Sequence, residues 1–496
     1  MKKRKTQPFF PLVFVLTASF VFIFSVTFLL STPPPIHHHN VLLHSTYSFI
    51  HQSQDDVEIA STSFRSTNFI VPENGVVVDD YLWKPSLSGT YYGCSNATPT
   101  FLKATSKTEP LRYLLIATSG GLNQMRTGII DAVAVAYILN ATLVVPKLDH
   151  HSFWKDNSEF DDVFDVDWFI SFLSQDVTIL KDLPAIEGTQ IRPYKAHVPR
   201  KCSPHCYRTR VLPLLNRKHA VELGKFDFRL SNSLSLELQK LRCRVNYHGL
   251  KFASPIREMG KLLVERIRMK SQRYIALHLR YEADMLAFSG CYYGGGEKER
   301  EELAAIRKRW KSLQASNPEK VRRHGRCLLT AEEVGLMLRA LGFGSDVHLY
   351  VASGQLYGGE ESLAPLRTLF PNFHSKETLA TEEELKPFAS HSSRMAALDF
   401  IVCEESDVFV TNNNGNMARM LAGRRKYLGH KPTIRPNAKK LTTLFMSKND
   451  TSWEEFSTMV RESQIKYMGD VDNSKSSDIY QNPTPCLCQQ QPDDDS

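Results

Sequence analysis

The stretch RYLLIATSGGLNQMRTGIIDAVAVAYILNATLVV, residues 112–145, decides the fold class. Its first six residues form a short apolar run, Leu122 to Asn140 repeats apolar residues at helical spacing, and ATLVV at 141–145 is a second short apolar run. A strand, a helix and a second strand in this order make a βαβ unit, whose two strands lie parallel in one sheet. The sequence therefore predicts an α/β protein with a parallel sheet.

A second series of the same kind begins at Arg273 with the strand RYIALHL. Thr330 and Glu333 form a capping box that opens a helix to about residue 341, and further strands are predicted at 347–353 and 407–411 with a helix at 362–370 between them. Two successive α/β series predict two Rossmann-like domains facing a cleft, at residues 110–260 and 261–440.

The amino-terminal residues read as a membrane anchor. Residues 9–30 carry no charge over 22 positions, which is about the length that crosses a bilayer as a helix, and four cations precede them. By the positive-inside rule, residues 1–8 are a cytoplasmic tail and the rest of the chain lies across the membrane. A cleaved signal peptide is the alternative, but its apolar region is usually shorter.

The flanks of the two domains differ from them in composition. Residues 31–109 mix Ser, Thr, His, Pro and acids and are expected to be a stem, and residues 441–496 are expected to be an acidic, largely disordered tail. The net charge of +8 is uneven, because residues 111–440 alone carry +13. That central excess fits a field that attracts an anionic ligand, or a diffuse surface charge. The overall composition excludes collagen-like, coiled-coil and wholly disordered proteins.

Cysteines and glycosylation sequons agree with a lumenal body. Nine Cys are too few for a disulfide scaffold, but six of them, Cys94, Cys202, Cys206, Cys243, Cys291 and Cys327, are candidates for a few bridges in an oxidising compartment. Cys202 and Cys206 could also form half of a zinc site, but no matching second pair follows, so a disulfide is favoured. Asn96, Asn140 and Asn449 each begin an N-glycosylation sequon.

The first candidate binding motif is Thr118 to Arg126, between the first strand and its helix. Gly120 and Gly121 allow close backbone approach, the helix amino terminus favours an anion, and Asn123 adds an amide for a diphosphate or a sugar hydroxyl. It matches neither the dinucleotide-binding nor the P-loop pattern. A simple tight turn is the alternative.

The second motif ends the strand at 273–279. Ligands of parallel α/β sheets bind outside the carboxyl ends of the strands, where His278, Leu279 and Arg280 are expected. Arg280 can hold a phosphate bidentately and offset charge on a departing diphosphate, while Glu282 and Asp284 follow closely. The alternative is an ion pair of Arg280 with one of these two acids that merely ends the strand.

The third motif is DFIVCEESDVFVTNNNGN, residues 399–416. Asp399 can accept hydrogen bonds from a nucleobase edge, and Ser406, Thr411 and the following amides can reach ribose and phosphate. The loop 412–416 can equally be an amide-rich turn.

Two other charged segments are assigned no chemistry. DDVFDVD at 161–167 contains Asp165 and Asp167 in the Asp-x-Asp pattern of metal-dependent transferases, but its acids alternate with apolar residues as at the start of an amphipathic helix. The basic run from Arg300 to Arg326 lacks interleaved aromatic residues and is expected to be a solvated helix face. We therefore expect no metal and no nucleic-acid partner.

These motifs in this order resemble the plant O-fucosyltransferase-like family of glycosyltransferases. SGGLNQMR, HLRYEADMLAFSGC, LYVASGQLYGG and ALDFIVCEESDVFV followed by GNMARMLAG are similar to its successive motifs, over roughly residues 80–440. The resemblance implies a GT-B-type fold and metal-independent, inverting transfer from a nucleotide sugar, typically GDP-fucose. It places Gly121 and Asn123 at the donor phosphate and fucose, His278 and Arg280 at the diphosphate, Asp399 at guanine, and Ser406 with Thr411 near the phosphates. No residue corresponds clearly to a catalytic base.

The sequence therefore predicts a Golgi glycosyltransferase, single-pass and with a lumenal body, that moves fucose from GDP-fucose to a protein or cell-wall glycan hydroxyl. Arg280 would stabilise the leaving diphosphate, and Glu282, Asp284, the leaving phosphate or water would take the acceptor proton. Two alternatives stay open: a rhamnosyl- or other sugar transferase acting on pectin, and a non-catalytic GT-B-like scaffold or glycan-binding protein.

Overall fold

The computed structural model describes residues 70–73, 82–83, 90–151, 156–185, 188–310, 313, 317–412, 414–429, 431–469 and 478–489. All of these residues belong to one unit by their contacts, Arg65–Ser496. The predicted cytoplasmic tail at 1–8 and membrane anchor at 9–30 lie outside the described residues. Among the helices of the described ranges, none is both long and apolar enough to cross a bilayer.

The first sheet has five parallel strands in the order β4-β3-β2-β6-β5. They are β2 (Tyr113–Thr118), β3 (Thr142–Val144), β4 (Ile179–Leu180), β5 (Tyr194–Ala196) and β6 (Ala220–Phe226). Helix α3 (Leu122–Leu139) connects β2 to β3, which confirms the βαβ unit read from residues 112–145.

The second sheet also has five parallel strands, in the order β11-β10-β7-β8-β9. They are β7 (Tyr274–His278), β8 (His348–Ala352), β9 (Phe373–His374), β10 (Val408–Thr411) and β11 (Thr433–Ile434). The strands predicted at 273–279, 347–353 and 407–411 are thus present, and the α/β class with parallel sheets is confirmed.

Both sheets contain a point where the strand order reverses. In the first sheet the chain moves outward through β3 and β4 on one side of β2, and β6 then pairs with the other side of β2. In the second sheet β8 and β9 lie on one side of β7 and β10 lies on the other. Such a reversal leaves a crevice at the carboxyl ends of the two strands involved, where α/β proteins bind ligands. The crevices are therefore expected at β2/β6 and at β7/β10.

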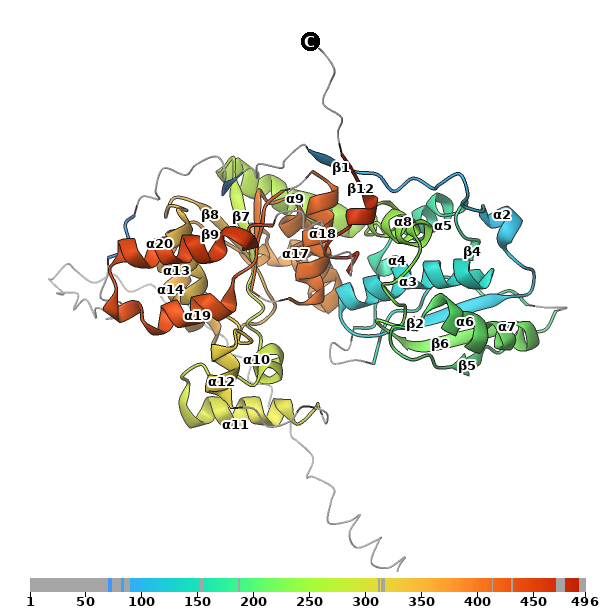
Figure 1. The fold of residues 1–496 in the computed structure, drawn as a ribbon, viewed down its shortest axis with the longest axis horizontal. Coiled ribbons are helices and arrows are strands. Elements are labelled where there is room, and N and C mark those ends of the chain that lie inside the picture. Colours follow the sequence, from blue (N-terminus) through green and yellow to red (C-terminus); the bar gives the residue numbers. More distant parts are fainter. Residues whose placement is uncertain are drawn as a thin grey trace, which may run out of the picture. The chain divides into compact units, whose positions relative to one another are not determined.

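Helices cover the sheets and join the two halves (Figure 1). The helices besides α3 are α2 (Ala104–Lys107), α4 (Phe160–Val163), α5 (Val166–Phe172), α6 (Pro204–Arg210), α7 (Leu212–Lys218), α8 (Leu236–Arg244), α9 (Ser254–Lys270), α10 (Ala283–Ser289), α11 (Gly296–Arg307), α12 (Pro318–Arg323), α13 (Ala331–Leu341), α14 (Gly359–Leu369), α15 (Lys376–Leu379), α16 (Glu382–Ala389), α17 (Ser392–Glu405), α18 (Asn416–Tyr427), α19 (Ala438–Met446) and α20 (Trp453–Gln464). The predicted capping box is present at the start of α13, where Thr330 and Glu333 cap each other's backbone amides.

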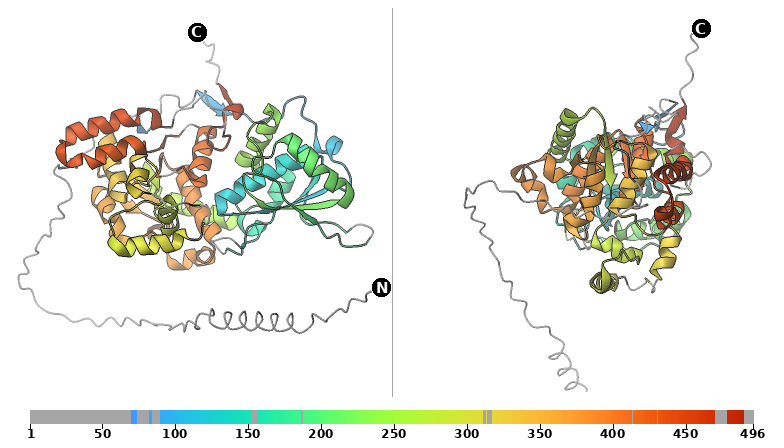
Figure 2. Two further views of the ribbon diagram at one scale, coloured as in Figure 1. Left: turned by 60° about the horizontal axis from the view of Figure 1, so that its bottom comes forward. Right: turned by 90° about the vertical axis from the view of Figure 1, so that its left-hand side faces the viewer.

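One apolar core runs through both halves. Ile116 and Ile129 from the first half and Leu263, Phe400 and Phe409 from the second are all buried in the same cluster. A second cluster, which includes Leu277 and Val410, lies on the other side of the second sheet. The first sheet is covered unequally, because only a small cluster around Leu115 packs on the side away from α3. In the left view of Figure 2, the helices of this half accordingly lie over one side of the sheet.

The end of the chain is more ordered than its acidic composition led us to expect. Helix α20 begins with a capping box at Ser452 and packs against α13, and β12 (Leu487–Gln489) pairs antiparallel with β1 (Tyr91–Gly93). Tyr480 donates a 2.6 Å hydrogen bond to Asp131 of α3. The prediction of a largely disordered tail is therefore wrong for residues 441–469 and 478–489, because specific partners elsewhere in the chain hold these acidic stretches.

Four disulfides explain much of this order. Cys94–Cys488 and Cys243–Cys486 attach the end of the chain to the first half, while Cys202–Cys206 and Cys291–Cys327 close local loops. The disulfide reading of Cys202 and Cys206 is confirmed. The bridges to Cys486 and Cys488 were not anticipated from the sequence, because both lie in the stretch expected to be disordered. Cys403 is a buried free thiol.

Candidate active site

The carboxyl edges of the two sheets are brought together by contacts between the halves. Asp156, which follows β3, accepts a 2.5 Å hydrogen bond from the backbone amide of Ser393 at the start of α17. Phe228, which follows β6, lies 5.6 Å by ring centroid from the guanidinium of Arg419, in the first turn of α18. Since α18 follows β10, the β2/β6 crevice and the β7/β10 crevice lie on the sides of the two sheets that meet.

The end of β7 carries a compact group of charged side chains at this edge. His278 is the last residue of β7, and Arg280 follows with a left-handed backbone at φ 49°. The Arg280 guanidinium donates to Glu282 at 2.6 Å and to both carboxylate oxygens of Asp284 at 3.0 and 2.8 Å. A non-glycine residue in this backbone region is strained, and such strain is concentrated at functional sites.

Burial and the arginine set the protonation of this group. Burial disfavours the charged form of Glu282, but Arg280 and then His278 favour it more strongly, so the pKa of Glu282 is lowered. Burial lowers the pKa of His278 to about 4, although Glu282 opposes the shift. At neutral pH the group therefore consists of a guanidinium, an ionised Glu282 and a neutral imidazole. A carboxylate held in this way is a weak base.

Two side-chain atoms at predicted donor positions are buried without a hydrogen-bond partner among the described residues. They are Nδ1 of His278 and Oδ1 of Asn123, in side chains only 7% exposed each. An unpaired buried polar atom costs about 1–3 kcal/mol, and it suits a site that a polar ligand completes. Both positions therefore fit a ligand rich in hydroxyl and phosphate groups.

The end of β10 is held rigidly against the end of β7. Thr411, the last residue of β10, lies opposite His278 in the parallel register. The side chain of Asn412 donates to the carbonyls of Leu279 and Leu329 at 2.9 and 2.8 Å and accepts from the Leu329 amide at 2.9 Å. The first amide of the predicted loop thus fastens the backbone around Leu279. His278, Leu279, Arg280 and Thr411 are therefore brought together as predicted.

Asp399 lies in the middle of α17 in a buried polar group. Its two carboxylate oxygens accept from Tyr350 Oη at 2.8 Å and from Lys376 Nζ at 3.0 Å. Lys376 also donates to the carbonyl of Ser353, directly after β8, at 2.8 Å. Burial alone would lower the pKa of Lys376, but Asp399 raises it; the pKa of Asp399 is itself raised by burial, although Lys376 opposes that shift. Sequence reasoning missed both partners: Tyr350 belongs to the motif LYVASGQLYGG but was given no role, and Lys376 stands in no recognisable pattern.

The glycine motif lies at the end of β2, in the first crevice. Gly120 has φ 90°, a conformation that favours glycine, and its amide donates to Asp149 Oδ2 at 2.7 Å. Gly121 is the residue before the first turn of α3, and it offers no side-chain cap to the helix amides. The Gly120 amide is therefore engaged by Asp149, another residue that the sequence did not single out, whereas the start of α3 is open to an anion.

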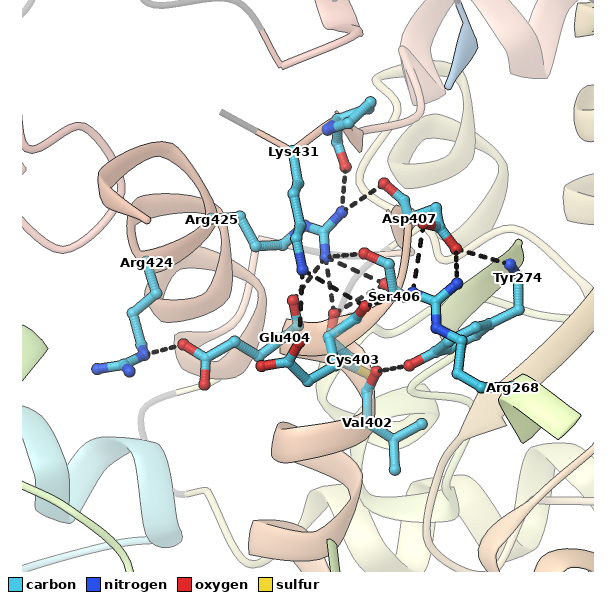
Figure 3. Close-up of polar contacts among 12 residues, drawn as sticks. Arg268, Tyr274, Val402, Cys403, Glu404, Ser406, Asp407, Arg424, Arg425 and Lys431 are labelled. Carbon is cyan, nitrogen blue, oxygen red and sulfur yellow. Dashed lines mark hydrogen bonds and ion pairs between the residues drawn. The ribbon is translucent and has the colours of Figure 1, made fainter. Parts of the chain in front are cut away.

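Ser406 does not belong with these residues. It ends α17 and precedes β10, so it lies at the amino edge of the sheet, five residues before Thr411 and roughly 16 Å away at about 3.3 Å per strand residue. It is fully buried, and its hydroxyl donates to the Cys403 carbonyl at 2.8 Å and accepts from Arg425 at 3.1 Å. Figure 3 shows this cluster, in which Arg425 is directed at the end of α17. The expected grouping of Ser406 with Thr411 is therefore corrected.

The remaining predictions concern the acidic run and the sequons. Asp162 belongs to the capping box of α4, and Asp165 caps α5 by accepting from the Trp168 amide at 3.0 Å, as expected for helix starts. Asn96 and Asn449 are exposed, whereas Asn140 ends α3 with φ 52°. Within the described ranges, no three His, Cys, Asp or Glu side chains gather in a way that could hold a metal ion.

With this geometry established, comparisons with known proteins decide the family. Residues 113–428 match the family described as GDP-fucose protein O-fucosyltransferase. The chain belongs to this family. The matched range contains both crevices and every predicted donor residue.

Individual relatives agree. The chain is 59% identical to Protein ROOT HAIR SPECIFIC 17 of Arabidopsis thaliana over 97% of its own length and 85% of that protein. It is 63% identical to O-fucosyltransferase 16 of the same plant, over 87% of this chain and 76% of the relative. It is 41% identical to Rhamnogalacturonan I rhamnosyltransferase 1, also from Arabidopsis thaliana, over 82% and 85%. The protein is therefore a glycosyltransferase.

Among solved structures, POFUT1 in complex with GDP aligns with 66% of this chain and all of that chain, at 14% identity. Its TM-score of 0.41 is too low to support an argument about the fold or the site.

Proposed function

We propose that this glycosyltransferase is an inverting, metal-independent enzyme of GT-B type that transfers fucose from GDP-fucose to a hydroxyl group of a protein or cell-wall glycan. The observation that carries the proposal is the His278–Arg280 segment at the point of strand reversal between β7 and β10, in a member of this family. This is the crevice where an α/β sheet binds a nucleotide.

The donor diphosphate would bind at the end of β7. Arg280 remains a cation, since Glu282 and Asp284 outweigh the effect of burial and raise its pKa. Because its two acid partners lie within the same turn, Arg280 can exchange part of this pairing for a phosphate without losing its position. Neutral His278 would use its unpaired Nδ1 towards the donor, and Asn123 its unpaired Oδ1. Asp399, Thr411 and the glycines complete the proposed donor set.

The chemical step would depend on stabilising the leaving group. As the bond between the sugar C1 and the diphosphate oxygen breaks, negative charge grows on GDP, and a guanidinium already in place stabilises that charge without reorganisation. No metal is required for this role. The acceptor hydroxyl attacks from the opposite face, which inverts the anomeric carbon. Its proton would leave late, to the departing phosphate, to water, or to Glu282 or Asp284, because the lowered pKa of Glu282 makes early proton removal unfavourable.

A second donor is favoured by one specific observation. The relative named as a rhamnosyltransferase is 41% identical to this chain over most of both proteins, so the same scaffold accommodates a different sugar. The alternative function is therefore transfer of rhamnose to a pectic acceptor.

We also assign the catalytic body to the Golgi lumen, behind a single-pass anchor at residues 9–30. Four disulfides support an oxidising compartment, since such bridges are rare in the cytosol.

Donor hydrolysis by the purified full chain tests the proposal, with a panel of GDP- and UDP-sugars and with or without a chelator. We expect turnover of GDP-fucose that the chelator does not change. Turnover of UDP-rhamnose alone would favour the second donor. Inhibition by the chelator would contradict the metal-independent mechanism.

A further inference from the structure

The carboxyl ends of the strands in the first sheet carry an excess of basic side chains. Residues 181–225 contain ten Lys or Arg against three Asp or Glu. We name as the cationic rim the five exposed side chains at or near the carboxyl ends of β3, β5 and β6, which are Lys147, Lys195, Arg200, Lys201 and Lys225. Part of the enzyme's basic excess therefore lies at the edge that faces the donor half.

Carboxylates neutralise only part of the rim. Glu222 lies 3.4 Å from Lys147 and 4.0 Å from Lys195, and Asp227 lies 3.2 Å from Arg200. Lys201 and Lys225 have no carboxylate within ion-pair distance in the described part of the chain. Five cations therefore share two acids, which leaves a surplus for an anionic partner.

The backbone of the rim is strained where these two lysines stand. Lys201 and Lys225 have φ 55° and 49°, and Phe228 nearby has φ 48°. The two segments are fastened together, because the Lys201 amide donates to the Phe228 carbonyl at 2.9 Å. Left-handed backbone at three non-glycine positions is costly, and its concentration here parallels Arg280 at the edge of the second sheet.

The rim also adjoins the donor crevice. Phe228, which is joined to Lys201 through the backbone, contacts Arg419 in the first turn of α18, directly after the polar loop that follows β10. A polymer lying along the rim would therefore lead towards the end of β7. This is the direction from which an acceptor must reach the sugar.

We infer that the cationic rim binds the acceptor, and that the acceptor is a polyanionic glycan carrying carboxylates on successive sugars. Four of the five rim side chains are Lys, each a compact charge on a flexible stem that can pair with a single carboxylate of a sugar. This inference rests on the proposed function, because it names the acceptor class for the same crevice.

A charge-reversal pair tests the rim against a matched control. Lys201→Glu/Lys225→Glu removes the two rim lysines that have no carboxylate partner. It places another non-glycine residue at each position, so the backbone strain at positive φ is unchanged. Arg217→Glu/Lys218→Glu makes the same change in charge on α7, where both side chains are exposed near the amino end of β6, away from the crevice. The affinity of the full chain for oligogalacturonate is measured for the wild type and both variants, with methyl-esterified oligogalacturonate and anionic vesicles as further probes.

We expect the wild type to bind oligogalacturonate, to bind it more weakly as salt rises, and to prefer it to the ester. The rim variant should lose about tenfold in affinity, and the α7 variant less than about twofold. Equal losses in both variants, unchanged affinity in the rim variant, or tighter binding of vesicles through the rim would overturn the inference. GDP binding is measured on the same samples. If the wild type binds GDP but no polyuronate, the acceptor role of the rim is wrong and the proposed donor site stands. If it binds polyuronate but no GDP, the proposed donor site is wrong.

Discussion

Arg425 and Arg280, at opposite edges of the second sheet, are held in opposite ways. At the amino edge, the two terminal nitrogens of Arg425 donate to five backbone carbonyls, those of Cys403, Glu404, Ser406, Asp407 and Pro432, and no carboxylate takes part (Figure 3). At the carboxyl edge, Arg280 lies on a strained backbone and pairs with two side-chain carboxylates.

This difference separates stability from chemistry. Carbonyls belong to the backbone, so Arg425 cannot leave them without unfolding the junction of α17, β10 and β11. Carboxylate partners on neighbouring side chains can share their cation with a ligand, and the strain at Arg280 persists only because the surroundings enforce it. The same residue type therefore reinforces the fold at one edge and is available to a substrate at the other.

The largest effect is expected from Arg425→Met. The carbonyls of Cys403 and Pro432 keep a second donor, Ser406 Oγ and the Phe409 amide, but those of Glu404, Ser406 and Asp407 lose the donor that Arg425 supplies. Each lost partner costs about 1–3 kcal/mol, so the free energy of unfolding should fall by about 3 kcal/mol or more. Denaturant unfolding measures the change. Arg268→Lys is the control at the same edge, because Arg268 is partly exposed in its pair with Asp407, and its effect should stay below about 1 kcal/mol. If Arg425→Met were as stable as the wild type, Arg425 would not reinforce the fold, and the contrast with Arg280 would fail.

Arg280→Ala should act on turnover. The loss of one preorganised charge at the leaving group typically costs about 10²–10³ in kcat, equivalent to about 2.7–4 kcal/mol. Steady-state donor turnover measures it, with Arg268→Lys expected to stay within about twofold of the wild type. If Arg280→Ala turned over the donor at the wild-type rate, the role given to the carboxyl edge would be wrong.

The buried imidazole at the carboxyl edge makes stability depend on pH. The pKa of His278 is lowered from 6.5 to about 4, so between these values the unfolded chain binds a proton that the folded chain refuses. The free energy of unfolding must therefore fall as the pH falls through this window. At pH 5, His278 lowers it by about 2 kcal/mol relative to neutral pH.

His278→Asn should flatten that slope. The difference in unfolding free energy between pH 7 and pH 5 is expected to be about 2 kcal/mol smaller in the variant than in the wild type. The exposed His324 provides the control, because His324→Asn should leave the slope as it is. Equal slopes for all three proteins would show that His278 is not kept neutral.

The smallest effect is expected from Glu282→Gln. The amide keeps the hydrogen bond that Glu282 accepts from Gly354 at 2.9 Å but gives up a charge beside Arg280. We expect kcat to fall about tenfold. Any fall of the rate at low pH that the wild type shows should remain in the variant, because a carboxylate whose pKa is lowered acts as a counter-ion of Arg280 rather than as the general base. If the fall of the rate at low pH disappeared in the variant, Glu282 would instead be identified as the base.

The sequence predicted the strands and most of the carboxyl edge because these depend on local patterns. An apolar run that ends in His-Leu-Arg must place these residues at the edge of a parallel sheet, and His278 and Thr411 are in fact opposite each other. Ser406 could also have been placed correctly, since a residue before a strand lies at the other edge from one that follows it. Ser406 was instead grouped with Thr411 because both belong to the third sequence motif.

Other features depend on distant partners that no local pattern reveals. Lys376 is an ordinary lysine in sequence, and only the fold buries it against Asp399. The acidic end of the chain has a disordered composition, but Cys486 and Cys488 bind it to Cys243 and Cys94, which are hundreds of residues away in sequence. Pairings of this kind follow from the tertiary structure alone.

The most direct test of the central claim is the melting temperature of the full chain with and without GDP, for the wild type, Arg268→Lys and Arg280→Ala. A ligand at about 100 times its Kd stabilises the folded state by about 2.7 kcal/mol, which is readily seen as a shift. We predict that GDP raises the melting temperature of the wild type and of Arg268→Lys, and that most of this shift is lost in Arg280→Ala. An equal shift in all three proteins would show that the nucleotide does not bind at the end of β7.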